Sequence, residues 1–448
     1  MSRKIGFWSV FQLVTVSQFG SGLLIPANLA PYGMLGLTGW LFSSTGAVLL
    51  ALMFALLCIR YPTTGGPQAY VNKAFGPSAA FFTGWTYWII SWVSTTAIVT
   101  SAVAYLTPLI GDQPMAIELL LEFFIIFGVT AVNLRGTYSA GNTNFLFVAF
   151  KILPLLLVPV IALFYFDKAN ITAVALPLDE LGSDMGGSPL NNVLLLTFWG
   201  FIGFESATAC AEGVKDPARV FPKALVLGTL FVAVVYFISS LGIMGIIPAN
   251  ILMNSEAPYT DAAKILFGGH WYLLISLIGC IVCIAAVNAW TLASGQIAAD
   301  ITKDRIVPRF FSKPNKHGAP VFALLFSCLG MLPLIYFTHS DNLAQKVNTI
   351  IDLSVTSFLF VYVICCLAFL KIIWQEKRVT REWQWYIGLL SLGFCLWVMC
   401  TTPLKTLIIC SLFVLSGLPI YLIRRKKLKV AMGEPLFQSP PSTLVSDT

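Results

Sequence analysis

The side chains with the most evident chemical potential surround two glycine-interrupted apolar stretches. The first is cut by Gly20-Ser21-Gly22, and the second is the run Trp199-Gly200-Phe201-Ile202-Gly203-Phe204-Glu205. Unpaired backbone groups cost several kcal/mol in hydrocarbon, so a broken helix persists there only where it lines a cavity or binds something. Freed N–H and C=O groups and the positive end of a half-helix can hold a ligand. Glycines that merely allow close helix packing would explain one break, but less well two. The two breaks therefore predict one binding site within a membrane.

Two tryptophans and two ionisable residues lie inside apolar stretches. Trp199 is beside the second break and Trp290 is well inside a later stretch, whereas the default place of a membrane tryptophan is the interface. Their faces could stack on a guanidinium or cover an ammonium group. Glu205 is a carboxylate within a span and is functional by default, the alternative being a structural hydrogen bond. Lys151 lies about 10 Å into its span, where it either serves the site or extends to the interface.

Composition indicates a membrane protein. The chain is 57% hydrophobic and 10% charged, against about 25% charged in soluble proteins. A run of about 20 apolar residues spans a bilayer, and we expect twelve such segments. They cover, approximately, 8–31, 38–59, 81–108, 115–133, 144–166, 190–211, 224–246, 271–297, 319–338, 348–374, 384–401 and 404–423. We interpret the first as a retained span and not a signal peptide.

The distribution of lysine and arginine predicts the orientation. With both termini cytoplasmic, most of the 27 basic residues fall in inner segments. Only four fall in outer segments: Lys168, Lys264, Lys346 and Lys405. The net charge of +7 therefore reflects membrane orientation and contact with anionic lipid, and it does not indicate nucleic acid binding.

Other function classes lack a matching pattern. The ten cysteines lie in or beside apolar spans, and Cys280 and Cys283 are interpreted as small buried hydrophobic residues, not as a metal or redox pair. The three histidines fall in predicted loops without a metal or nucleophile constellation, so we expect no enzyme activity, no metal and no cofactor. A channel should show a filter or charge rings, and none is evident.

The two breaks also predict the organisation of the chain. An odd number of spans separates them, so the second half enters the membrane in the opposite sense. We expect a first repeat at 1–166 with helix 1 broken at 20–22, an external loop at 167–189 and a second repeat at 190–374 with helix 6 broken near 200–203. Two further helices at 384–423 and a cytoplasmic tail at 424–448 complete the predicted all-α fold.

Several motifs resemble the amino acid–polyamine–organocation superfamily over nearly the whole chain. They include Gly20-Ser21-Gly22 with Leu24 to Ala30, Tyr61-Pro62 to Gly65-Gly66, Trp199 to Glu205, Val214-Lys215-Asp216-Pro217, and Trp290 to Gln296. The chain is most similar to the branch of basic amino acid and polyamine antiporters, especially arginine/agmatine exchangers. The resemblance implies a LeuT-like 5+5 inverted repeat with two added helices, a homodimer, and transport without sodium.

The resemblance also implies roles for individual residues. The first break would hold a substrate carboxylate through Gly20, Ser21 and Gly22, and carbonyls near Ile202 would hold its ammonium group. Trp199 would act as a gate and Trp290 as a platform for the aliphatic chain. Glu205 would form an outer gate with two tyrosines and could sense protons. The matching gate tyrosines and substrate-contacting hydroxyl residues are Tyr87, Tyr362, Ser91, Thr95 and Ser354.

Some positions depart from the arginine/agmatine pattern. Ser17 and Thr95 stand where that group carries asparagine, and Gln18 stands where an aliphatic residue is usual. Asp352 is an additional carboxylate that either pairs with a cationic side chain or caps the outer end of span ten. Lys151 stands where sodium-driven relatives bind their cation, so it could instead couple transport to protons.

These observations predict a sodium-independent secondary transporter in a bacterial inner membrane. The leading hypothesis is exchange of a basic amino acid for its decarboxylated amine by alternating access. A proton-coupled importer that uses Lys151, including one for neutral amino acids, is the alternative. A membrane amino acid sensor is the alternative of another class.

Overall fold

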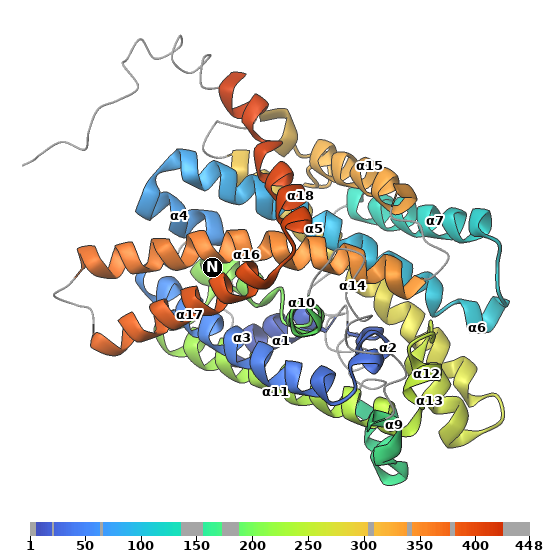
Figure 1. The fold of residues 1–448 in the computed structure, drawn as a ribbon. Helices are drawn as coiled ribbons and strands as arrows, with labels where there is room; N and C mark the ends of the chain where they lie inside the picture. The colour runs from blue at the N-terminus through green and yellow to red at the C-terminus, as the bar shows by residue number, and fades with distance from the viewer. Residues whose placement is uncertain are drawn as a thin grey trace, which may run out of the picture.

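The structure is a computed structural model that describes residues 6–19, 22–62, 66–135, 156–172, 188–302, 309–337, 343–376 and 381–423. Within these ranges the chain is helical, apart from turns, connecting segments and one isolated bridge between Pro314 and Pro320. Figure 1 shows long helices that lie side by side and run across the molecule.

Eight helices in the described part of the chain are long and apolar enough to cross a membrane. They are built on α3 (Met34–Arg60), α5 (Pro77–Ala104), α7 (Met115–Leu134), α11 (Pro217–Ile246), α14 (Trp271–Ile301), α16 (Leu343–Gln375), α17 (Glu382–Thr401) and α18 (Leu404–Leu415). Two shorter apolar helices are Leu156–Tyr165 and α15 (Val321–Phe337). The chain is therefore a multi-pass membrane protein.

The two apolar stretches with glycine breaks are both interrupted helices. The first consists of α1 (Phe7–Gln18) and α2 (Ile25–Leu29), followed by the short turn η1 (Ala30–Tyr32). The second consists of α10 (Pro189–Trp199) and the 3-10 helix η3 (Phe204–Gly213), joined by a turn. The α-helical pattern ends at Trp199, because the N–H groups of Gly200 to Ile202 bond the carbonyl oxygens three residues earlier, as in a 3-10 helix.

One boundary differs from the sequence-based expectation. The seventh apolar segment was expected at 224–246, but α11 already begins at Pro217. Asp216 precedes it with a left-handed backbone, φ 53°, and Pro217 supplies the preset φ that suits a first helical position.

Short helices mark the two ends of the molecule. At one end α4 (Pro67–Phe75) lies between α3 and α5, and at the other end α6 (Thr107–Ile110) lies between α5 and α7. The short helices α12 (Ala249–Leu252) and α13 (Pro258–Phe267) lie near α6, and α9 (Lys168–Thr172) packs against α11. We call these ends the α4 end and the α6 end.

Packing divides most helices into two groups. The α3 group comprises α1, α3, α10 and α11, in which α3 packs against α10 and α11, and α1 packs against α11 and η3. The α5 group comprises α5, α14, α15 and α16, in which α5 packs against each of the other three. Two helices join the groups: α16 also packs against α10, and α17 contacts α3 and α16.

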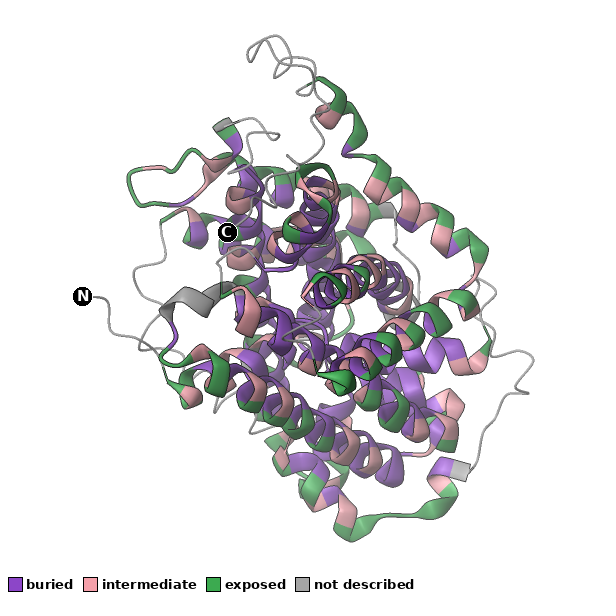
Figure 2. Cartoon of the chain, turned by 90° about the vertical axis from the view of Figure 1, so that its left-hand side faces the viewer, coloured by how far each residue is buried: buried purple, intermediate pink, exposed green. Residues whose placement is uncertain are grey.

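Burial follows this arrangement. The most apolar window of α5 is 89% buried, against 17% for the helix that begins at Leu404. Figure 2 shows buried residues at the centre and exposed ones on the outward faces of the helices. Leu120, Phe124 and Phe127 are exposed apolar residues of α7. Lipid would cover such a surface in a bilayer, so its exposure is the normal state of an outer helix in a membrane protein.

Candidate substrate site and gate

The two interrupted helices meet directly. The Ser17 hydroxyl near the end of α1 lies 2.9 Å from the Gly203 carbonyl oxygen in the second break. Gly203 has φ +117°, and a Cβ there would lie 2.9 Å from the Ser17 carbonyl oxygen. Only glycine adopts this backbone region readily. A glycine at this position therefore allows the ends of both half-helices to touch.

The helix α11 packs against the first break. Tyr236 donates its hydroxyl to the Gln18 carbonyl oxygen at 2.8 Å. A Cβ on Gly22 would lie only 1.8 Å from the Tyr236 ring, so no larger residue fits there without a shift. The Gln18 side chain also donates to Thr229 of α11 at 3.3 Å. The polar group at position 18 thus ties α1 to α11.

Trp199 is held by a residue that sequence reasoning missed. Its indole Nε1 donates to the Ser94 hydroxyl of α5 at 3.0 Å, and both residues are buried. Ser94 lies three residues after Ser91 and therefore on the same face of the helix. This spacing is the one sequence feature that could have indicated Ser94 as a site residue. The bond connects the α3 group to the α5 group at the level of the second break.

Glu205 forms a three-residue cluster with Tyr87 and Tyr362. Tyr87 of α5 donates to Glu205 Oε1 at 3.1 Å, and Tyr362 of α16 donates to Oε2 at 2.9 Å. The backbone N–H of Gly203 also donates to Oε2 at 3.1 Å. Glu205 has no solvent exposure. Among the described residues, no lysine or arginine forms an ion pair with Glu205. The three hydrogen-bond donors therefore stabilise its buried carboxylate.

The Glu205 cluster lies nearer to the α4 end than Trp199 does. Tyr87 precedes Ser94 along α5, so the Glu205 cluster lies about 10 Å closer to the α4 end than the Trp199–Ser94 bond does. The helix α17 starts near Arg60 at the α4 end, and Thr401 at its other end donates to Asn191 near the start of α10. Because α10 ends at Trp199, the α6 end lies on the other side of Trp199.

An aromatic residue connects Trp290 to the Glu205 cluster. The Phe358 ring of α16 lies 6.3 Å from the Trp290 ring, 5.9 Å from the Tyr87 ring and 6.1 Å from the Tyr362 ring, measured between centroids. Trp290 lies within α14 and is 8% exposed. Edge-to-face and tilted contacts of this kind favour a defined geometry. Phe358 is the second residue that sequence reasoning missed.

The other proposed substrate contacts are buried. The hydroxyls of Ser91 and Thr95 donate to carbonyls of their own helix, Trp88 O and Ser91 O. Ile202 is buried in the turn of the second break. The Ser354 hydroxyl of α16 is buried and has no hydrogen-bond partner in the described part of the protein. Ser354 is thus a polar group whose partner a bound molecule could supply.

Asp352 lies apart from the Glu205 cluster. It is 6% exposed on α16 and precedes Tyr362 by about 15 Å along the helix axis. Burial raises the pKa of Tyr32 in the connection after α2; a hydrogen bond with the Asn192 side chain lowers this pKa, and the nearby charge of Asp352 raises it. Asp352 therefore lies near Tyr32 on the α6 side of the molecule.

Three predicted site residues lie outside the described residues. They are Gly20, Ser21 and Lys151. The neighbours of the first two, Phe19 and Gly22, are described and are buried against α11.

The geometry defines a class of protein. Two interrupted membrane helices meet in the core, and a tryptophan, a glutamate and two tyrosines join them to the neighbouring helix group. This is the arrangement of a membrane transporter with a mid-membrane site. The sequence model of the family "Amino acid permease" matches residues 5–430, and the chain belongs to this family, within the amino acid–polyamine–organocation superfamily. Its members are transporters and not enzymes.

Three relatives illustrate the similarity. The chain is 27% identical over 434 residues to a protein of Bacillus subtilis (strain 168) provisionally named an arginine/ornithine antiporter, covering 89% of this chain and 92% of the relative. It is 29% identical to the cadaverine/lysine antiporter of Escherichia coli (strain K12), with 77% of each chain covered. It is 27% identical to the putrescine transporter PotE of Haemophilus influenzae, covering 88% and 90%.

Proposed function

We propose that this protein exchanges a basic amino acid for an amine by alternating access, without sodium. Its similarity to antiporters named for arginine, ornithine, lysine and cadaverine supports this substrate class. The single observation that carries the proposal is the contact between the two interrupted helices at Ser17 and Gly203, beside Trp199 and Glu205.

The substrate would bind across the two breaks. Backbone N–H groups at Gly20, Ser21 and Gly22 would hold its carboxylate, and the carbonyl of Ile202 would accept from its ammonium group. The ring faces of Trp199 and Trp290 would pack on its chain and cationic end. Polar contacts would come from Ser91, Thr95 and Ser354, whose hydroxyl has no hydrogen-bond partner among the described residues.

Asp352 would select for a cationic side chain. A carboxylate buried in a membrane protein needs a compensating charge, and no described lysine or arginine forms an ion pair with it. A substrate amine approaching from the α6 end would supply that charge.

The proposal includes the membrane arrangement. The eight long spans, two shorter apolar helices and two interrupted helices together would give twelve crossings, of which the first ten form two inverted repeats. Both termini would face the cytoplasm of a bacterial cell, in a homodimer held in the inner membrane.

Counterflow in proteoliposomes tests the exchange. Vesicles would be loaded with arginine, ornithine, lysine, agmatine, cadaverine or a neutral amino acid, and uptake of the labelled basic amino acid would be measured. We expect uptake only into vesicles that hold a basic amino acid or its amine. Equal uptake into empty vesicles under an imposed pH gradient would contradict exchange.

Lys151 supports a second candidate, a proton-coupled importer. A buried ammonium group can lose its proton when desolvated and regain it in each cycle. Replacement Lys151→Ala should then abolish the dependence of uptake on external pH, whereas Lys151→Arg should lock the charge and slow transport. A pH dependence unchanged in Lys151→Ala would leave the exchanger as the function.

A further inference from the structure

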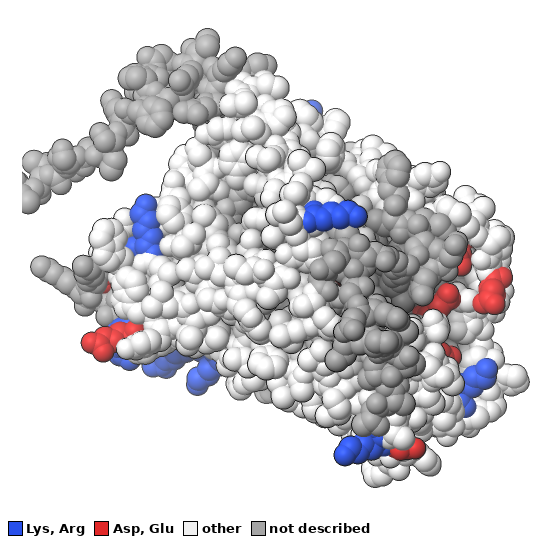
Figure 3. All heavy atoms as spheres, in the orientation of Figure 1, with Lys and Arg blue, Asp and Glu red and all other residues white. Residues whose placement is uncertain are grey.

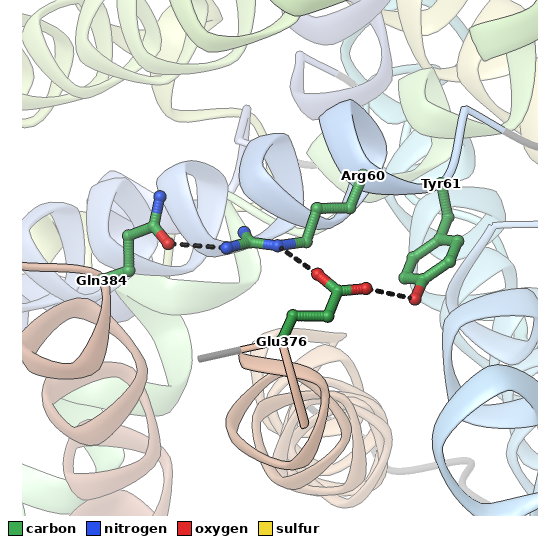
Figure 4. Close-up of polar contacts among 4 residues, drawn as sticks. All are labelled: Arg60, Tyr61, Glu376 and Gln384. Carbon is green, nitrogen blue, oxygen red and sulfur yellow. Dashed lines mark hydrogen bonds and ion pairs between the residues drawn. The ribbon is translucent and has the colours of Figure 1, made fainter. Parts of the chain in front are cut away.

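Polar side chains join three helices at the α4 end. Arg60 is the last residue of α3 and Glu376 directly follows α16, and Arg60 Nε lies 3.2 Å from Glu376 Oε2. Tyr61 donates its hydroxyl to Glu376 Oε1 at 2.7 Å. Arg60 Nη2 donates to Gln384 Oε1 of α17 at 2.6 Å. Figure 4 shows the Glu376 carboxylate between the Arg60 guanidinium and the Tyr61 hydroxyl.

Aromatic contacts surround this polar cluster. The Arg60 guanidinium carbon lies 5.9 Å from the centre of the Phe369 ring, one of the buried rings of α16. The Lys73 ammonium group of α4 lies 5.8 Å from the Tyr61 ring. Cation–π attraction at these distances holds both side chains over their neighbours. The contact area therefore includes α4 as well as the ends of α3, α16 and α17.

The cluster connects the two helix groups. Arg60 and Tyr61 lie at the end of α3, which packs on α10 and α11, whereas Glu376 lies at the end of α16, which packs on α5 and also contacts α10. A separation of the α3 group from the α5 group at the α4 end must break both the Arg60–Glu376 and Tyr61–Glu376 contacts. The Glu205 cluster joins the same two groups, and Tyr362 precedes Glu376 by about 20 Å along the helix axis.

The burial of the pair suits a contact that forms and breaks. The Arg60 and Glu376 side chains are 11% and 35% exposed. A fully exposed ion pair contributes little, and a fully buried pair is costly to separate because it leaves charges without solvent. A pair with one side open to solvent stabilises the closed arrangement, and water can hydrate both charges once they part.

We propose that Arg60 and Glu376 are gating residues that hold the α4 end closed and separate in each transport cycle. They form a closure additional to the Glu205 cluster, at the mouth of the path. This inference rests on the proposed alternating-access function. It assigns Tyr61 and Gln384 as positioning residues, because each holds one partner of the pair.

Accessibility of Cys58 measures the opening. Cys58 is fully buried beside Tyr70, two residues before Arg60. In a variant that keeps Cys58 as its sole cysteine, the rate of labelling by a polar maleimide is measured on purified protein without substrate. We expect Arg60→Gln and Glu376→Gln to raise this rate about tenfold, the scale on which one strong contact biases a two-state equilibrium. Tyr61→Phe should raise it less.

Charge reversal and a matched ion pair provide the controls. The double variant Arg60→Glu with Glu376→Arg should return labelling toward that of the parent, because it restores the ion pair in the reversed direction. Arg219→Gln breaks the ion pair between Arg219 and Asp216, whose side chains are 86% and 50% exposed within one segment. This variant should label like the parent.

The outcomes separate the gate from the function. Single variants that keep their melting temperature and substrate binding but label within twofold of the parent would overturn the gate, even where counterflow proves exchange. If a single variant fails to fold, unchanged labelling in Tyr61→Phe overturns it equally. If the variants label faster but the parent shows no counterflow, the proposed antiporter function is wrong. The Arg60–Glu376 contact would then still control a conformational opening of the α4 end.

Discussion

At the scale of single residues, the Trp199–Ser94 hydrogen bond determines where a large ring lies. Most described hydroxyls on α5, such as those of Ser91, Thr95 and Ser101, donate to carbonyls of the same helix. Ser94 instead accepts from an indole of the other helix group. Because a buried indole N–H needs an acceptor, the ring is held over α5.

Removal of this acceptor should free the Trp199 ring. In Ser94→Ala the indole N–H loses its partner, at a cost of about 1–3 kcal/mol, so we expect weaker substrate binding and a shifted tryptophan emission. Binding is measured by calorimetry and emission by fluorescence on the same sample. Ser101→Ala removes a hydroxyl that donates to the Ala97 carbonyl oxygen of α5, and it should leave both readouts unchanged. Equal behaviour of the two variants would contradict the role of Ser94.

The Glu205 carboxylate accepts from two tyrosines, and an amide cannot replace it fully. Glutamine has one carbonyl oxygen, so in Glu205→Gln at least one of the bonds from Tyr87 and Tyr362 is lost or weakened. We expect the exchange rate to fall about tenfold, which corresponds to about 1.4 kcal/mol, with the substrate affinity little changed. Glu382→Gln, at an exposed carboxylate in the first turn of α17, is the control. A normal rate in Glu205→Gln would remove the cluster from the gate.

At the scale of elements, the second break depends on the backbone of one glycine. Gly203 turns the chain from α10 into η3 with φ +117°, and its carbonyl oxygen accepts from Ser17 and Ser206. Its N–H bonds the Glu205 carboxylate. The turn thus positions α1, η3 and the Glu205 carboxylate at once.

Gly203→Ala should therefore be unfavourable. The left-handed backbone and the close Ser17 oxygen together cost about 1–3 kcal/mol, so we expect a lower melting temperature and slower exchange. Gly128→Ala on α7 is the matched control, since a Cβ there meets nothing within 4 Å and helix propensity favours alanine by about 1 kcal/mol. Both melting temperatures are measured by a thermal shift assay in detergent. Equal values for the two variants would contradict the role of the Gly203 backbone.

At the scale of the whole molecule, charge is concentrated at the ends. Figure 3 shows a largely uncharged face with acidic atoms gathered near the α6 end. There Glu256 lies near Glu118, Asp112 and Asp261. Burial raises the pKa of the Glu256 carboxyl first, and the neighbouring carboxylates raise it further. This end would attract cationic amines through its negative potential.

Because the pKa of Glu256 is raised in the folded protein, the stability of the fold should depend on pH through this group. The folded protein holds the Glu256 proton more tightly than the unfolded chain, so this group favours folding below its unfolded pKa of 4.5. The benefit is lost as the pH rises through the folded pKa. We expect Glu256→Gln to raise the melting temperature at pH 7 by about 1–2 °C and to have little effect below pH about 4. Glu382→Gln at the start of α17 should not raise it. A pH-independent effect would exclude titration as the cause.

The amino-acid sequence by itself determined the class of the fold and its chemistry. Hydropathy is a local property, so the long spans are placed within a few residues, as in α7 and α17. Membrane backbone must pair internally, so the glycines at both interruptions could be recognised without a structure. The family motifs then indicated an amino acid transporter, which the comparisons confirmed.

Only the tertiary structure decided which distant residues meet. Trp199 pairs with Ser94, and Arg60 with Glu376, across gaps that no local pattern encodes. The way in which the interrupted helices pack against α5 placed Glu205 on the α4 side of Trp199. Such contacts depend on how helices far apart in the chain pack together, because side-chain direction and depth are determined jointly by both partners.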